Sequence, residues 1–154
     1  MKLRWFDKEL KECGEDAMVY SDDLPSEYVI FHDSKSGFTL HAEGPDCEVL
    51  GAQYHPVEGK PMQCTGLMDK SGKEICQGDI VRWDDCSNGR HWRVAVVNYG
   101  KGNTLSFDCF DCPAIANSSA HGHSFGFGNF IYTDTENHLE IIGNIYENTE
   151  LLAA

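Results

Sequence analysis

The chain has 154 residues, of which 41% are hydrophobic and 11% aromatic, so it can bury the core of one domain or of two small lobes. Its 25 acidic and 12 basic side chains give a net charge of −13, which disfavours phosphate backbones and anionic lipid as partners unless the basic residues gather on one face. Residues 1–61 carry 6 basic and 13 acidic side chains, and residues 62–154 carry 6 and 12, so the charge is spread evenly.

Neither a secretory signal nor a membrane span is predicted. Four basic and two acidic residues fall within the first eleven positions, and no apolar run approaches the roughly 18 residues of a membrane helix. We therefore expect a cytoplasmic protein without a membrane association. Its seven cysteines are odd in number, which in a reducing compartment argues against a disulfide scaffold, and we expect most of them to be free thiols.

The first part of the chain predicts a small β-rich region. Short strands are predicted over residues 2–6, 27–32, 37–43 and 48–54, with a loop or frayed turn over 11–18. The following HPVEGKP, with two prolines and a glycine, is the best candidate for a boundary. We thus predict an N-terminal β-rich subdomain over residues 1–61 and a second subdomain over 62–154.

The second subdomain continues the run of short β-branched and aromatic strands, which favours a small barrel or sandwich. The strands are predicted over 62–68, 73–77, 79–83, 91–99, 104–110 and 139–147. The last turn, ENTELL, predicts a short helix capped by Asn148 or Thr149. The Gly- and Ser-rich segment 116–129 predicts a long loop of the functional or mobile kind.

The most patterned stretch is QCTGLMDKSGKEICQGDIVRW, which begins at Gln63. Its central DKSGK predicts a hairpin turn, because Asp69 can accept backbone N–H bonds two residues on and Gly72 can adopt the positive φ that such a turn needs. Asp69, Glu74 and Asp79 could also form a metal or catalytic carboxylate set. No histidine accompanies them, and the interpretation as turn caps and solvated charges is favoured.

At this stretch the sequence resembles the YopX family of bacteriophage and prophage proteins. The resemblance rests on an aromatic start with Arg4 and Asp7, on the central Thr65–Val81 segment, and on the closing IGNIYENTELL. It implies a mainly β fold in which an SH3-like β-barrel follows a smaller N-terminal β-rich (α+β) region. It implies no known activity. The chain departs from the family at Cys64 and Cys76, which occupy positions that look aromatic in relatives.

A zinc site is the clearest candidate for bound chemistry. Cys109 and Cys112 form C-F-D-C, and His121 and His123 follow as H-G-H. Thiolates and imidazoles are the ligands that zinc prefers, so these four residues could hold a structural Zn²⁺. Two ordinary strand-end cysteines beside a polar loop are the alternative. A thioredoxin-like role for the same cysteines is disfavoured, because no helix is predicted to begin at the first one.

Aromatic residues of the Gly-rich loop, Phe125, Phe127 and Phe130, could form a ligand surface, but we expect them to pack over the end of the barrel. A phosphate-binding loop is excluded there, since the strand, helix and lysine of such a loop are missing. No serine, histidine and acid can be grouped into a triad from the sequence.

Several functions remain open. The leading hypothesis is a non-enzymatic phage or prophage accessory protein that binds a host or phage protein, with homo-oligomerisation possible through exposed strand edges. One alternative is an acidic DNA mimic that acts on a host nucleic-acid enzyme. Another is nucleic-acid binding through a local basic and aromatic patch. That patch would comprise Arg82, Arg90, Arg93 and Lys101, with Trp92 able to stack on bases. A metal-dependent enzyme ranks last.

Overall fold

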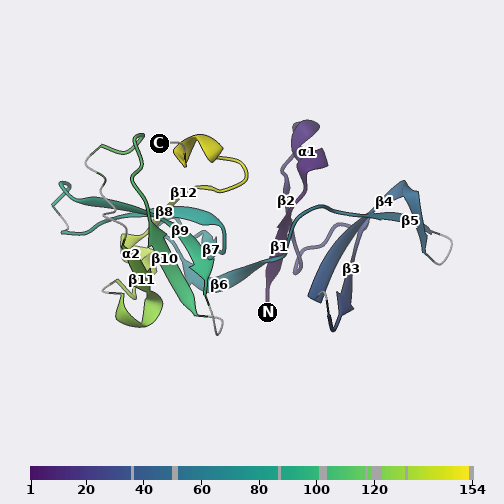
Figure 1. Cartoon of the computed structure of the whole chain (residues 1–154), viewed down its shortest axis with the longest axis horizontal. Coiled ribbons are helices and arrows are strands. Elements are labelled where there is room, and N and C mark those ends of the chain that lie inside the picture. Colours follow the sequence, from purple (N-terminus) through teal and green to yellow (C-terminus); the bar gives the residue numbers. More distant parts are fainter. Residues whose placement is uncertain are drawn as a thin grey trace. The chain divides into compact units, whose positions relative to one another are not determined.

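The computed structural model describes residues 1–35, 37–49, 52–86, 88–100, 104–116, 118, 123–130 and 132–152, with the backbone alone for 44–49, 52–55 and 129. The chain is mainly β and divides into two compact units, Met1–Gln63 and Cys64–Ala154 (Figure 1). The division lies close to Pro61, where the sequence predicts a boundary. Among the described residues, none of the helices has the length and hydropathy that a membrane crossing requires.

Unit 1 holds two groups of strands around one apolar core. Its elements are β1 (Leu3–Phe6), α1 (Lys8–Glu12), β2 (Met18–Tyr20), β3 (Tyr28–Asp33), β4 (Gly37–Val49), β5 (Ala52–Pro56) and the start of β6 (Met62–Met68). β1 lies between β2 and the first residues of β6, while β3, β4 and β5 form an antiparallel sheet of their own. The core lies where these groups meet, and Trp5 of β1 packs with Tyr28 of β3 and Leu40 of β4.

Unit 2 is built on a five-stranded antiparallel sheet in the order β11-β10-β9-β8-β12 (Figure 1). Its remaining elements are β7 (Glu74–Cys76), β8 (Asp79–Asp84), β9 (Trp92–Tyr99), β10 (Leu105–Cys109), β11 (Ser124–Gly126), η1 (Phe127–Asn129), α2 (Thr135–His138), β12 (Glu140–Asn144) and η2 (Thr149–Leu151). β7 pairs with β6 and completes the hairpin that the DKSGK turn predicts.

Both faces of this sheet are covered in its centre. Val81 and Trp83 of β8 point into the larger apolar cluster, and Ile80, which has the opposite parity, belongs to a second and smaller cluster. Because side chains alternate between faces along a strand, a strand buried on both sides reads as a continuous apolar run. The face with Val81 and Trp83 forms the larger core, and the Ile80 face is buried as well.

The chain makes a tight turn after β12, and side chains of the closing segment stabilise it. Asn144 accepts the backbone N–H groups of Tyr146 and Glu147 through its side-chain oxygen, at 3.0 and 2.9 Å. The side chain of Asn148 accepts the N–H of Asn144 at 3.1 Å and lies directly against Gly143. A Cβ atom at position 143 would lie 2.6 Å from Cγ of Asn148. Position 143 is therefore glycine because the side chain of Asn148 approaches its backbone too closely for any other residue.

Three local predictions need correction or refinement. Residues 8–12 form the helix α1, which the sequence does not predict. The single strand predicted over 48–54 is wrong, because Val49 and Ala52 belong to two antiparallel strands, β4 and β5, that pair with each other. The loop predicted over 116–129 contains β11 and η1 at its end, whereas 117 and 119–122 lie outside the described residues.

Candidate binding site

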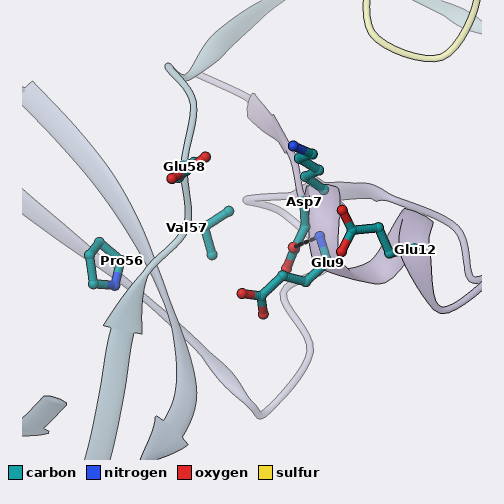
Figure 2. Close-up of a pocket in the computed structure, with 7 residues that line it drawn as sticks. Asp7, Glu9, Glu12, Pro56, Val57 and Glu58 are labelled. Atoms are coloured by element: carbon teal, nitrogen blue, oxygen red, sulfur yellow. Dashed lines mark hydrogen bonds between the residues drawn. The ribbon is translucent and has the colours of Figure 1, made fainter. Parts of the chain in front are cut away.

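A pocket of about 280 Å³ lies in unit 1, between α1 and the chain that leaves β5 (Figure 2). Carboxylates dominate its lining, and a short apolar wall stands opposite the helix. The lining residues are Asp7, Lys8, Glu9, Glu12, Pro56, Val57 and Glu58. Sequence reasoning does not find this pocket, because its two sides are about 50 positions apart and α1 is not predicted.

Asp7 fixes the helix side of the pocket. It is the N-cap of α1, and its Oδ1 accepts the N–H groups of Glu9 at 3.0 Å and Leu10 at 3.5 Å. Its Oδ2 accepts the hydroxyl of Tyr28 at 2.8 Å. Burial, together with the hydrogen bond to Asp7 and nearby carboxylates, raises the pKa of Tyr28 well above its ordinary value, so this hydroxyl stays a neutral donor.

The other carboxylates of the pocket are exposed and converge on it from two segments. Glu9 and Glu12 are three residues apart on α1 and so share one face of that helix. Glu58 faces them from the other side, next to Val57, whose backbone N–H is held by the carbonyl of Leu40 at 2.9 Å (Figure 2). With Lys8 as a cation in the lining, the pocket keeps an excess of negative charge beside an apolar wall.

The predicted zinc ligands are placed in different surroundings. Cys112 is buried in the smaller cluster of unit 2 and donates its thiol hydrogen to the carbonyl of Leu151 at 3.5 Å, whereas Cys109 packs against the larger cluster. Burial raises the pKa of Cys109 to about 11, against the lowering effect of Arg93. His123 is exposed, and His121 lies outside the described residues. The zinc site stays a prediction.

The predicted basic patch is divided between the two faces of the sheet. Arg82 lies over the ring of Trp92 at 5.1 Å and pairs with Glu140, its Nη2 lying 2.8 Å from Oε2. Arg93 is the register partner of Trp83 and so lies on the other face, where its Nε is 3.3 Å from Oδ2 of Asp85. Arg90 lies in the exposed β8–β9 loop, and Lys101 is outside the described residues. Nucleic-acid binding through these residues stays a prediction.

The acidic residues of the signature hairpin are hydrogen-bond acceptors for backbone groups. Asp69 Oδ1 accepts the N–H groups of Ser71 and Lys73, both at 2.9 Å, and its Oδ2 accepts that of Ile141 at 3.0 Å. Asp79 accepts the N–H of Cys76 at 2.8 Å, and Glu74 accepts that of Gly66 at 3.1 Å. The interpretation as turn caps is confirmed for Asp69. Asp69 and Asp79 are buried, however, and are not solvated charges.

The same hairpin contains a feature that the sequence does not predict. Cys64 of β6 and Cys76 of β7 are register partners and form a disulfide. Elsewhere in the described part of the chain, Cys13, Cys86, Cys109 and Cys112 are free thiols. The only sign of the pair in the sequence is that a cysteine stands near each end of the predicted hairpin.

Comparison with known proteins agrees with this architecture. A family model described as YopX protein matches residues 2–153. The chain belongs to the YopX family. The crystal structure of protein yopX from Bacillus subtilis is similar, with a TM-score of 0.55 and 20% sequence identity over 99% of this chain and 98% of that one. At this identity the likeness shows a shared fold. A comparison with curated proteins finds no match.

The YopX signature therefore describes architecture. Its central and closing motifs are joined in unit 2, where the backbone N–H of Ile145 donates to the carbonyl of Gly78 at 2.9 Å. The N–H of Lys70 donates to the carbonyl of Leu139, just before β12, at 2.8 Å. The link from Asp69 to Ile141 lies between them. In this member of the family, residues of the central and closing motifs thus help to hold the hairpin, β8 and β12 together. The aromatic residues of the loop also pack inward, as expected, because Phe125, Phe127 and Phe130 contact the larger apolar cluster.

Proposed function

We propose that this YopX protein is a non-enzymatic binding module whose acidic pocket in unit 1 accepts a basic side chain of a host or phage protein. The observation that carries the proposal is the set of four carboxylates around one cavity, supplied by Asp7, Glu9, Glu12 and Glu58. A concave site lined by charges of one sign concentrates its field and attracts the opposite charge.

The chemistry of the pocket favours arginine or lysine as the group bound. Both carry an aliphatic stem that can lie along Pro56 and Val57 while the charged end meets the carboxylates. Arginine suits the site better, because its planar guanidinium can donate to two carboxylates at once.

The fixed role of Asp7 supports binding over catalysis. A general base must reach and abstract a substrate proton. Both carboxylate oxygens of Asp7 already accept hydrogen bonds, from the amides of α1 and from Tyr28. Asp7 is therefore a positioned hydrogen-bond acceptor in the lining of the pocket.

The remaining expectations about this chain belong to the same proposal. We interpret the sheet of unit 2 as part of an SH3-like barrel that supports the module. We further propose that the protein is encoded by a phage or prophage, works in the cytoplasm, and can associate with a second copy of itself through a strand edge.

The test uses a short capped peptide with one arginine and a matched peptide with citrulline, which keeps the shape and removes the charge. We expect the arginine peptide to shift the backbone amide resonances of Glu9, Leu10 and Val57 in a salt-dependent way, and the citrulline peptide to leave them in place. The triple variant E9Q/E12Q/E58Q should lose the shifts. E27Q/E43Q/E136Q is the control, because it removes the same number of exposed charges elsewhere.

Equal shifts with both peptides, or shifts that survive in E9Q/E12Q/E58Q, would contradict the proposal. If binding to a host enzyme is instead displaced by duplex DNA and weakens equally in both triple variants, the DNA mimic is the better description. A salt-sensitive gel shift with single-stranded DNA that is lost in R82Q would favour the basic patch.

A further inference from the structure

A second group of polar side chains lies in unit 2, on the hairpin of β6 and β7. Cys64 and Cys76 face each other across the two strands, and Glu74 precedes Cys76 by two positions, which places both side chains on the same face of β7. A carboxylate oxygen of Glu74 and the two sulfurs all lie within 4.8 Å of one another. Within the described part of the chain, these three residues are the group in which at least three potential metal ligands lie close together.

The donor set is suited to a thiophilic divalent cation. Two thiolates and one carboxylate match the preferences of zinc and cadmium, and a tetrahedral ion would keep one position for water or an outside ligand. In the disulfide form the sulfurs are bonded to each other and carry no thiolate charge. Metal binding therefore requires the reduced hairpin.

The backbone around the three donors is fixed independently of the disulfide. The N–H of Cys76 is held by Asp79 at 2.8 Å, and the hydroxyl of Thr65 donates to the carbonyl of Ile75 at 2.7 Å. The register of the hairpin shifts between Cys64 and Met68, as in a β-bulge, and bulges commonly re-aim side chains beside sites. Reduction should therefore leave the ligands close to one another.

The two sulfurs of the proposed site are buried, whereas its carboxylate is partly exposed. Cys76 is 1% exposed and Cys64 is 7% exposed, while Glu74 is half-buried at the edge of the hairpin. Glu74 is therefore the donor nearest to solvent. An apolar surround also strengthens the attraction between the ion and its ligands.

We propose that the hairpin is a redox-gated metal site, in which reduction of the Cys64–Cys76 disulfide creates a zinc site completed by Glu74. A dithiol reductant breaks the S–S bond and is itself oxidised to a disulfide, while the two cysteine sulfurs receive two electrons and two protons. Zn²⁺ then binds the two sulfurs and the Glu74 carboxylate, and the two thiol protons are released. A disulfide oxidant reverses the process: it accepts two electrons and two protons to become two thiols, the Cys64–Cys76 bond forms again, and the ion is released.

The first experiment compares the oxidised protein with protein reduced by a phosphine, which takes oxygen from water as it converts the disulfide to two thiols. Zn²⁺ alone is added, and native mass spectrometry counts the ions held. We expect one ion on the reduced protein and none at this site on the oxidised protein. Cd²⁺ in place of Zn²⁺ should add a sulfur-to-metal absorption band in the ultraviolet whose intensity corresponds to two thiolates.

Variants locate the site. C64S/C76S should lose the ion and the absorption band, and the matched pair C109S/C112S should keep both. E74Q keeps an acceptor for the N–H of Gly66 and removes the charge, so it should fold and weaken zinc binding by about tenfold or more, since even outer-shell partners contribute about 10–100-fold. Circular dichroism checks that each variant is folded.

Three results would overturn the proposal. The first is a reduced, folded protein that holds no zinc at all. The second is unchanged zinc affinity in E74Q together with retention of the ion by C64S/C76S. The third is loss of the ion in C109S/C112S and not in C64S/C76S, which would place the zinc at the cysteines of the C-F-D-C motif.

Discussion

Individual residues of the signature act through bonds to backbone groups that are distant in sequence. Asp69 is the clearest example, because one carboxylate closes its own turn and also holds β12 through Ile141. Burial by itself would raise the pKa of Asp69, but the hydrogen bonds from Ile141, Ser71 and Lys73 outweigh it and lower the pKa below the ordinary value of 3.8. A single side chain thus couples acid stability to the joining of the hairpin and β12.

We expect D69N to lower the free energy of unfolding at pH 7 by about 1–3 kcal/mol, because an amide replaces one acceptor oxygen with a donor and leaves a buried N–H unpaired. The wild-type contribution is complete above the pKa of the unfolded carboxyl and is lost as the pH falls through the lower folded pKa. The difference between D69N and the wild type should therefore shrink in acid. Urea unfolding at pH 7 and at several pH values below 4 measures it.

The exposed E136Q serves as the control, with no change expected beyond a few tenths of a kcal/mol. A D69N protein that is as stable as the wild type at pH 7, or a difference that grows in acid, would contradict the role given to Asp69.

At the scale of elements, the hairpin and the sheet could be largely predicted, whereas two local features could not. The alternating pattern of DIVRW and the turn residues of DKSGK are local signals, and they agree with β8 and with the β6–β7 hairpin. α1 has only five residues, too few for helical periodicity to be read, and its cap depends on Asp7. Residues 48–54 look like one strand because their residue types do not separate β4 from β5, which pair with each other.

The pocket and the disulfide depend on information that local patterns do not contain. Cys64 and Cys76 meet because of the register of β6 and β7, which shifts at a bulge. A shift by one residue would place the two side chains on opposite faces. Glu58 reaches α1 only through the packing of unit 1. Residue types could therefore suggest a hairpin and an acidic surface, and they could not identify the partners of these side chains.

The DKSGK turn provides a prediction at the same scale. Gly72 has a φ of 81° and open space around it, so a substitution there meets backbone strain and no collision. We expect G72A to destabilise the protein by about 1–2 kcal/mol, and G72N to cost clearly less because asparagine tolerates this conformation better. Thermal unfolding of the two variants measures the difference. Equal costs for alanine and asparagine would contradict the interpretation.

At the scale of the whole molecule, each unit has a core of its own. Leu40 is buried in unit 1 and Leu139 in unit 2, both at 1% exposure or less. We expect L40A and L139A each to cost about 2–5 kcal/mol, with the loss confined to the unit that holds the residue. Hydrogen exchange should rise in β3 and β4 for L40A and in β8–β10 for L139A.

The reciprocal comparison supplies the control, since each variant has an undisturbed unit within the same chain. Faster exchange throughout the chain in either variant would show that the two cores unfold together. That result would contradict the division into two independently stabilised units.

The contact between Gly143 and Asn148 has a consequence for how sequences of this kind can change. Any side chain at position 143 would displace the asparagine that closes the turn. A smaller residue at 148 would make room but would forfeit that closure. The two positions should therefore show strong epistasis. A mutational scan should find substitutions at 143 tolerated only on a background where 148 has already changed. Neutral change at position 143 would then depend on an earlier change at position 148.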